Sequence, residues 1–122
     1  MTVSQNKDLA IRLIEQVWND GNLSLVPEFF AGPMLEEALG LHEILTTAFP
    51  DLRIDIEDLI AEGDKVVLRL TFRGTHEGPF RGISPTGRRI SFTAIRIYRV
   101  ADGKITESWA NQDALGLLQQ LQ

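Results

Sequence analysis

Hydrophobic residues recur at intervals of three and four along the first half of the chain. This spacing places them on one face of a helix, so it predicts amphipathic helices over residues 4–19 and 34–48. A short helix over residues 23–30 lies between them, and it tolerates Pro27 because proline fits the first turn of a helix. The first half of the chain is therefore predicted to be helical.

Hydrophobic and polar residues alternate in the second half. This period of two predicts strands over residues 52–57, 66–76, 90–100 and 105–112, followed by a last helix over 115–121. An Asp-Gly pair at residues 102–103 predicts a tight hairpin between the last two strands. Helices followed by an antiparallel meander indicate an α+β fold, in which the helices cover one face of a curved sheet and can enclose a pocket.

Size and charge narrow the class of protein. The 122 residues suffice for one domain and one core, and the formal charge of −5 is unlike that of a nucleic-acid binder. The chain has no cysteine, and its N-terminal segment does not resemble a signal peptide. No apolar run is long enough to span a bilayer, so we expect a cytoplasmic protein that binds neither membranes nor nucleic acids.

The junction between the last strand and the last helix carries the most informative residues. If the strand alternates without interruption, one side of it presents Ile105, Glu107, Trp109, Asn111 and Asp113. If that side lines a cavity, Asp113 lies in partly apolar surroundings and is able to act as an acid and a base. The alternative is that Asp113 caps the last helix, which is the commoner role for a carboxylate at that place. The two roles are compatible.

The chain has two histidines, His42 and His76, and each is a candidate functional group. His76 shares its parity with Phe72 and so is predicted to point inward, where it could move protons beside a carboxylate; alternatively its ring binds the backbone of the Gly74–Gly78 bend. His42 lies off the hydrophobic stripe of its helix and is expected at the surface or an edge. Two separated histidines without further ligands predict no metal site.

Two polar residues lie within the predicted strand 90–100. Arg96 is surrounded by apolar residues, and it either pairs with Asp113, Glu107 or a substrate carboxylate or lies on the exposed, dimer-facing side of the sheet. Tyr98 has the same parity and carries a phenol that could donate to an enolate, although packing in the core is the simpler role.

Several short segments, taken in order and at their spacing, resemble the SnoaL-like polyketide cyclases of the nuclear transport factor 2-like superfamily. The resemblance covers nearly the whole chain. The matching segments are Val17-Trp-Asn-Asp-Gly21, Ala48-Phe-Pro-Asp-Leu52, Glu62-Gly-Asp-Lys-Val66, Gly74-Thr-His-Glu-Gly-Pro-Phe80, Pro85-Thr-Gly87, Asp102-Gly-Lys-Ile105 and Glu107-Ser-Trp109 with Asp113.

The resemblance implies a cone-shaped α+β barrel with a deep apolar pocket, often dimeric through its sheet. It also implies aldol cyclisation without a metal or an organic cofactor, with a pocket carboxylate equivalent to Asp113 as acid and base. The sequence departs from the family pattern in two places. Residues 30–34 lead almost directly into the third helix, where the family has an extra segment, and Ser108 stands where the family often has a histidine.

Together these observations predict one domain over residues 1–122 that binds a hydrophobic carbonyl compound and forms a homodimer. Asp113 and His76 are the predicted catalytic residues, and the predicted substrate contacts are Trp109, Phe72, Arg96 and Asn111. No cofactor and no metal are expected. The alternative is a non-catalytic ligand-binding or dimerisation module of the same fold.

Overall fold

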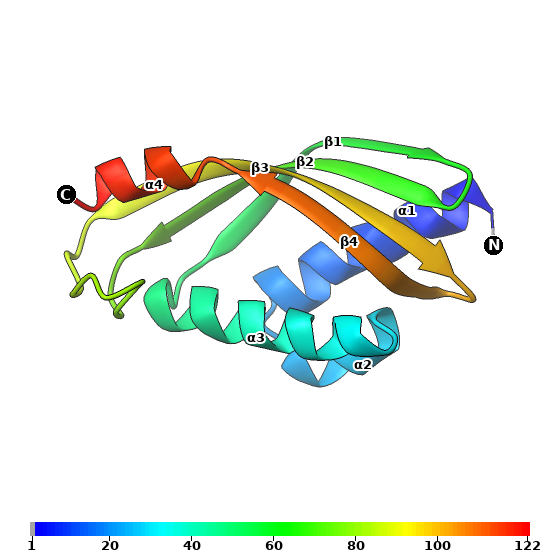
Figure 1. Cartoon of the computed structure of the whole chain (residues 1–122), viewed down its shortest axis with the longest axis horizontal. Coiled ribbons are helices and arrows are strands. Elements are labelled where there is room, and N and C mark those ends of the chain that lie inside the picture. Colours follow the sequence, from blue (N-terminus) through cyan, green and yellow to red (C-terminus); the bar gives the residue numbers. More distant parts are fainter. Residues whose placement is uncertain (1) are drawn as a thin grey trace.

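The computed structural model describes residues 2–122, which form an open antiparallel sheet with helices against its concave face (Figure 1). Helices α1 and α3 lie under the sheet, and the two ends of the chain lie at opposite ends of the long axis. The α+β class and the cone-like arrangement predicted from the sequence are confirmed. The elements, in chain order, are α1 (Val3–Arg12), η1 (Leu13–Asn19), η2 (Leu23–Leu25), α2 (Val26–Phe29), α3 (Pro33–Ala48), β1 (Arg53–Glu62), β2 (Lys65–Thr75), β3 (Arg89–Ala101), β4 (Lys104–Gln112) and α4 (Ala114–Gln120).

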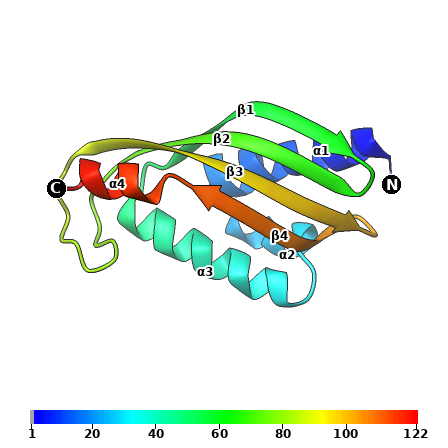
Figure 2. The same ribbon diagram turned by 45° about the horizontal axis from the view of Figure 1, so that its top comes forward.

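The four strands are ordered β1-β2-β3-β4, and each pairs with the next in the chain. Both edge strands carry a bulge: Glu57 is the extra residue in β1, and Thr106 is the extra residue in β4. A bulge bends its strand and increases the local twist. The sheet therefore curves over the helices, as Figure 2 shows from a second direction.

The core lies between the sheet and the helices. On β2 the alternate residues Val66, Leu68, Leu70 and Phe72 are buried, which confirms the parity predicted for this strand. They meet Leu9, Ala10, Leu13, Ile14 and Val17 from the first helical segment, together with Leu45 and Ala48 from α3. Burial of these side chains fixes the register of β2, because a slip by one residue would turn the apolar set to solvent.

The first helical segment begins earlier than predicted and changes its winding halfway. Thr2 caps the N-terminus of α1, and Gln5 completes a capping box with it. From Leu13 to Asn19 the chain continues as a π-helix, whose wider turns the spacing of apolar residues did not reveal. Within residues 2–122, no helix has both the length and the apolar character that crossing a membrane requires.

The short connection into α3 also completes one edge of the sheet. Phe30 forms a parallel bridge with Ile105, and the Ala31 amide donates to the Ile105 carbonyl at 3.0 Å. This contact lies beside β4, at the edge of the sheet. The chain thus covers part of that edge with only a few residues.

Candidate functional site

A cavity of about 260 Å³ lies between the concave face of the sheet and the helices η1, α2 and α3. Its volume is slightly below the range of about 300–1,000 Å³ that is typical of small-molecule sites. Most of its lining is apolar, and Phe72, stacked on Phe92 with ring centroids 4.7 Å apart, forms part of the sheet wall. Its polar lining residues are Glu37, His42, Arg96, Tyr98 and Ser108.

Three of these residues form a polar cluster on β3 and β4. Tyr98 pairs in register with Ser108, and Arg96 is two residues before Tyr98, so the three side chains share the inner face. Arg96 Nη1 donates to Ser108 Oγ at 2.9 Å, and its Cζ lies 5.8 Å from the Tyr98 ring centroid. Burial raises the pKa of the Tyr98 phenol, and the positive Arg96 opposes that rise without cancelling it. The phenol is therefore protonated near neutral pH and able to donate a hydrogen bond.

His42 reaches the same cavity from α3, on the opposite wall. Only 8% of the residue is exposed, its ring centroid lies 5.0 Å from that of Trp18, and its Nε2 lies 3.4 Å from the Val17 carbonyl oxygen. A carbonyl oxygen only accepts, so this contact places the ring proton on Nε2. In the neutral ring with this tautomer Nδ1 carries the lone pair, and it has no hydrogen-bond partner within residues 2–122.

The winding of η1 explains why the Val17 carbonyl is free to accept. Asp20 donates its amide to the Glu15 carbonyl, and Asn22 donates its amide to the Gln16 carbonyl. Gly21, with φ of 71°, ends the helical path directly after η1. No backbone amide of the described residues is left for Val17, so its carbonyl takes the imidazole of His42.

The expectation that His42 lies at the surface or an edge is wrong. His42 follows Ala38 by four residues and precedes Leu45 by three, which places it on the buried side of α3. The sequence contained this signal, but the predicted stripe was drawn too narrowly through Leu41. A buried imidazole on the cavity wall is the candidate group that the sequence reasoning missed.

The expectation that Trp109 and Asn111 line the cavity is also wrong. The prediction assumed uninterrupted alternation along β4, but the bulge at Thr106 shifts the parity beyond it. Ser108 therefore faces the cavity, whereas Trp109 is 45% exposed on the outer face, with Arg99 Cζ lying 5.6 Å from its ring centroid. Asn111 is exposed as well.

Asp113 lies at the strand–helix junction, as predicted, but it is exposed and does not line the cavity. Its Oδ1 accepts from the Gly116 amide at 2.9 Å, and its own amide donates to the Thr93 carbonyl at 2.9 Å. The capping role is therefore confirmed. The acid/base role predicted for Asp113 stays a prediction, to which this position lends no support.

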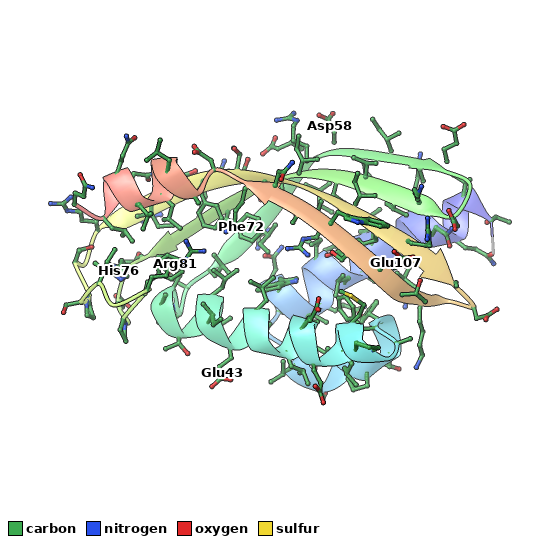
Figure 3. The ribbon with its side chains drawn as sticks, viewed as in Figure 1. Glu43, Asp58, Phe72, His76, Arg81 and Glu107 are labelled. Carbon is green, nitrogen blue, oxygen red and sulfur yellow. The ribbon has the colours of Figure 1, made fainter. Side chains whose placement is uncertain are left out.

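His76 is fully buried but lies outside the cavity, at the end of the sheet near the β2–β3 connection. Figure 3 labels His76 at this end of the molecule, and the lining of the cavity includes Phe72 but not His76. Its Nδ1 accepts from the Thr86 amide at 3.1 Å, and its ring centroid lies 5.8 Å from that of Phe49. The ring thus holds the backbone of the β2–β3 connection at Thr86, whereas the alternative role given from the sequence was a bond to the backbone of the Gly74–Gly78 bend. Its predicted catalytic role stays a prediction.

A second, more polar hollow of about 410 Å³ adjoins the cavity, and Trp18 and His42 line both. Asp20, Thr46 and Asp51 are among its other lining residues. His42 therefore lies between an apolar chamber and a polar one. Within residues 2–122, no group of three or more histidine or acidic side chains is arranged to hold a metal ion.

Comparisons with known proteins agree with this architecture. A family model described as SnoaL-like polyketide cyclase matches residues 8–121, whereas the comparison with curated proteins gave no match. Among solved structures, AclR from Streptomyces galilaeus, provisionally described as a hydroxylase, has 30% identity and a TM-score of 0.87, covering 98% of this chain and 82% of its own. IdmH from Streptomyces antibioticus, provisionally described as a polyketide cyclase, has 31% identity and a TM-score of 0.83, covering 96% and 98%. A SnoaL-like protein from Jannaschia sp. CCS1, with the same provisional description, has 25% identity and a TM-score of 0.87, covering 97% and 92%.

Proposed function

The chain belongs to the SnoaL-like polyketide cyclase family, and on that premise we propose that its cavity binds a small hydrophobic carbonyl compound and moves a proton at the carbon next to the carbonyl. One observation carries the proposal. A histidine with a free ring nitrogen and a cluster of hydrogen-bond donors face one largely apolar cavity from opposite walls.

In this proposal His42 is the base. Nδ1 removes the proton next to the carbonyl, and the electron pair of the broken C–H bond passes to the carbonyl oxygen, which becomes an enolate. In a cyclisation, the enolate carbon bonds to a second carbonyl carbon of the same molecule, and the imidazolium returns its proton to the new alkoxide. In an isomerisation, the proton returns to a different carbon.

The polar cluster supplies the donors that the enolate oxygen needs. Ser108 Oγ accepts from Arg96, so the hydroxyl hydrogen of Ser108 is free to be donated to a ligand. The protonated Tyr98 phenol is a second donor, and the charge of Arg96 adds a favourable potential. Such donors have their greatest effect in an apolar chamber that excludes water.

The volume of the cavity limits the size of the compound. A chamber of about 260 Å³ suits a molecule of one or two rings better than a large polycyclic one. The second hollow, which shares His42, offers a polar route for exchange of the His42 proton with solvent. All of the proposed steps use side chains of this chain, without a cofactor.

We test the function with a panel of one- and two-ring ketones and lactones. A compound that binds the folded state should raise the melting temperature. Binders are then incubated with the protein in D₂O, and NMR follows the exchange of hydrogens next to the carbonyl. His42→Gln, which keeps the polarity but removes the base, should slow this exchange about 10²–10⁴-fold.

Asp113→Asn distinguishes the two assignments of the base, because asparagine retains the capping ability. If Asp113→Asn abolishes exchange while His42→Gln does not, Asp113 is the base and our assignment is wrong. If neither variant slows exchange, both assignments fail.

The exposed position of Asp113 favours one alternative, a non-catalytic ligand-binding module. Ligands would then raise the melting temperature without any exchange at carbon. We also propose a homodimer formed through the outer face of the sheet, where Ile95 and Trp109 are 49% and 45% exposed. Sedimentation at several concentrations tests the dimer, and fractionation of cells tests the predicted cytoplasmic location.

A further inference from the structure

Four of the six arginines on the strands form an ion pair with a carboxylate, and Arg96, like Arg89 at the start of β3, forms none in the described part of the chain. Within residues 2–122, Arg53, Arg69, Arg73 and Arg99 each form an ion pair with an aspartate or a glutamate. Glu107, which the sequence suggested as a partner for Arg96, pairs with Arg99 instead. Arg96 is the one guanidinium that lines the cavity, and no carboxylate of the described residues lies within ion-pair distance of it.

The groups around Arg96 leave much of its binding capacity unused. A guanidinium carries five N–H donors in a planar fork, and it stays charged in proteins. The neutral Ser108 oxygen accepts from Nη1, and the Tyr98 ring lies beside Cζ, but neither group carries a negative charge. Glu37 lines the same cavity from α3, yet its side chain is not paired with Arg96. A half-buried cation without a counter-ion is costly, and a bound anion would relieve that cost.

We propose that the cavity selects ligands that carry a carboxylate, which the guanidinium of Arg96 binds. Carboxylate and guanidinium match as two parallel hydrogen bonds, which leaves the hydroxyl hydrogen of Ser108 and the Tyr98 phenol for the enolate oxygen of the same ligand. The inference rests on the proposed function and narrows its substrate to a keto acid of one or two rings. Because Arg96 and His42 lie on opposite walls, the carboxylate end faces β3 and the reacting carbon faces α3.

The decisive comparison uses one protein and two probes, 4-acetylbenzoate and 4-acetylbenzamide. They differ only in that a carboxylate is replaced by a neutral amide, and both carry a ketone. Calorimetric titration of the wild-type protein should give a dissociation constant at least tenfold lower for the acid. Arg96→Met should remove this preference, and Arg96→Lys should keep part of it. Arg69→Met, which removes an exposed arginine paired with Asp58 on the same sheet, should keep it fully.

Each outcome bears on a different claim. Equal affinity of the wild-type protein for the acid and the amide overturns the carboxylate site but leaves the carbonyl-binding cavity intact. Binding of neither probe overturns the carboxylate site and also argues against the proposed function. The wild-type comparison needs no variant, so a fold that does not tolerate Arg96→Met does not weaken the test. If Arg96→Met folds and still prefers the acid, the anion lies elsewhere and the proposal is wrong.

Discussion

Asn19 links the π-helix to the sheet beside the cavity, and its removal should destabilise the protein measurably. The side-chain Nδ2 donates to the Ile54 carbonyl at 2.9 Å, and the Ile54 amide donates to Oδ1 at 2.7 Å. Both bonds are partly buried, and they join residues that are far apart in the sequence. Asn19→Ala deletes both bonds and leaves both backbone groups of Ile54 without those partners.

The size of the effect follows from the two bonds. Each is worth about 0.5–1.5 kcal/mol net, so the free energy of unfolding should fall by about 1–3 kcal/mol. For a domain of this size, about 1 kcal/mol corresponds to about 4 °C in melting temperature, so we expect a loss of about 4–12 °C. Urea unfolding followed by circular dichroism gives the free energy, and the slope with urea should stay unchanged.

A matched control lies three residues away. Asn22 is exposed, and its Oδ1 accepts only from the Ser24 hydroxyl, so Asn22→Ala should stay within about 0.5 kcal/mol of the wild type. If Asn19→Ala is as stable as Asn22→Ala, the two bonds to Ile54 do not hold η1 against β1, and the reasoning fails. A change in the urea slope would instead indicate that the variant no longer unfolds in two states.

Three further predictions concern individual side chains. Phe72→Ala should cost about 3–5 kcal/mol in urea unfolding, because it deletes a buried ring stacked on Phe92; a loss below about 1 kcal/mol would show that the cavity collapses to fill the space. Asp113→Ala should cost about 0.5–2 kcal/mol by the loss of the cap, while Asp113→Asn stays close to the wild type; equal losses would argue against capping. Burial tends to raise the pKa of Asp51, but hydrogen bonds from the amide and hydroxyl of Thr75 outweigh it and lower that pKa. The resulting stability is present above the pKa of the unfolded carboxyl and is lost as the pH falls through the lower, folded value. Asp51→Asn should therefore weaken the pH dependence of the urea midpoint in the acidic range, and an unchanged profile would refute this assignment.

Much of the fold could be predicted because periodicity reports burial directly. The alternation of β2 appears in the structure as predicted, since both of its neighbours are strands and β2 itself contains no extra residue, the bulge in its pairing with β1 being at Glu57 of β1. Pro27 lies in the first turn of α2, and Asp113 caps α4, because both residues act through local backbone geometry. Such features depend on a few adjacent residues, and a single sequence contains them.

Apart from the misplacement of His42 on the regular helix α3, the errors arose where the chain departs from ideal geometry. The apolar spacing of residues 13–19 fits an α-helix as well as it fits a π-helix, so the sequence pattern does not distinguish them. The bulge at Thr106 could not be recognised from the sequence either, because the residues before and after it were taken to alternate between the two faces as in a regular strand. One extra residue turned Trp109 and Asn111 to the outer face and Ser108 to the inner one.

These two irregularities determine which polar groups the cavity contains. With ideal alternation from Ile105, β4 would have presented Trp109 to the cavity in place of Ser108, and Arg96 would have had no hydroxyl partner across the strand pair. With regular α-helical bonding through Gly21, the Val17 carbonyl would have been occupied by a backbone amide, and the ring of His42 would have had no fixed tautomer. The extra residue in β4 turns Ser108 toward Arg96, and the π-helical turns leave the Val17 carbonyl for the ring of His42 on the opposite wall. The chemistry proposed for this cavity therefore depends on departures from regular secondary structure, which explains why alternation alone pointed to the wrong face of β4.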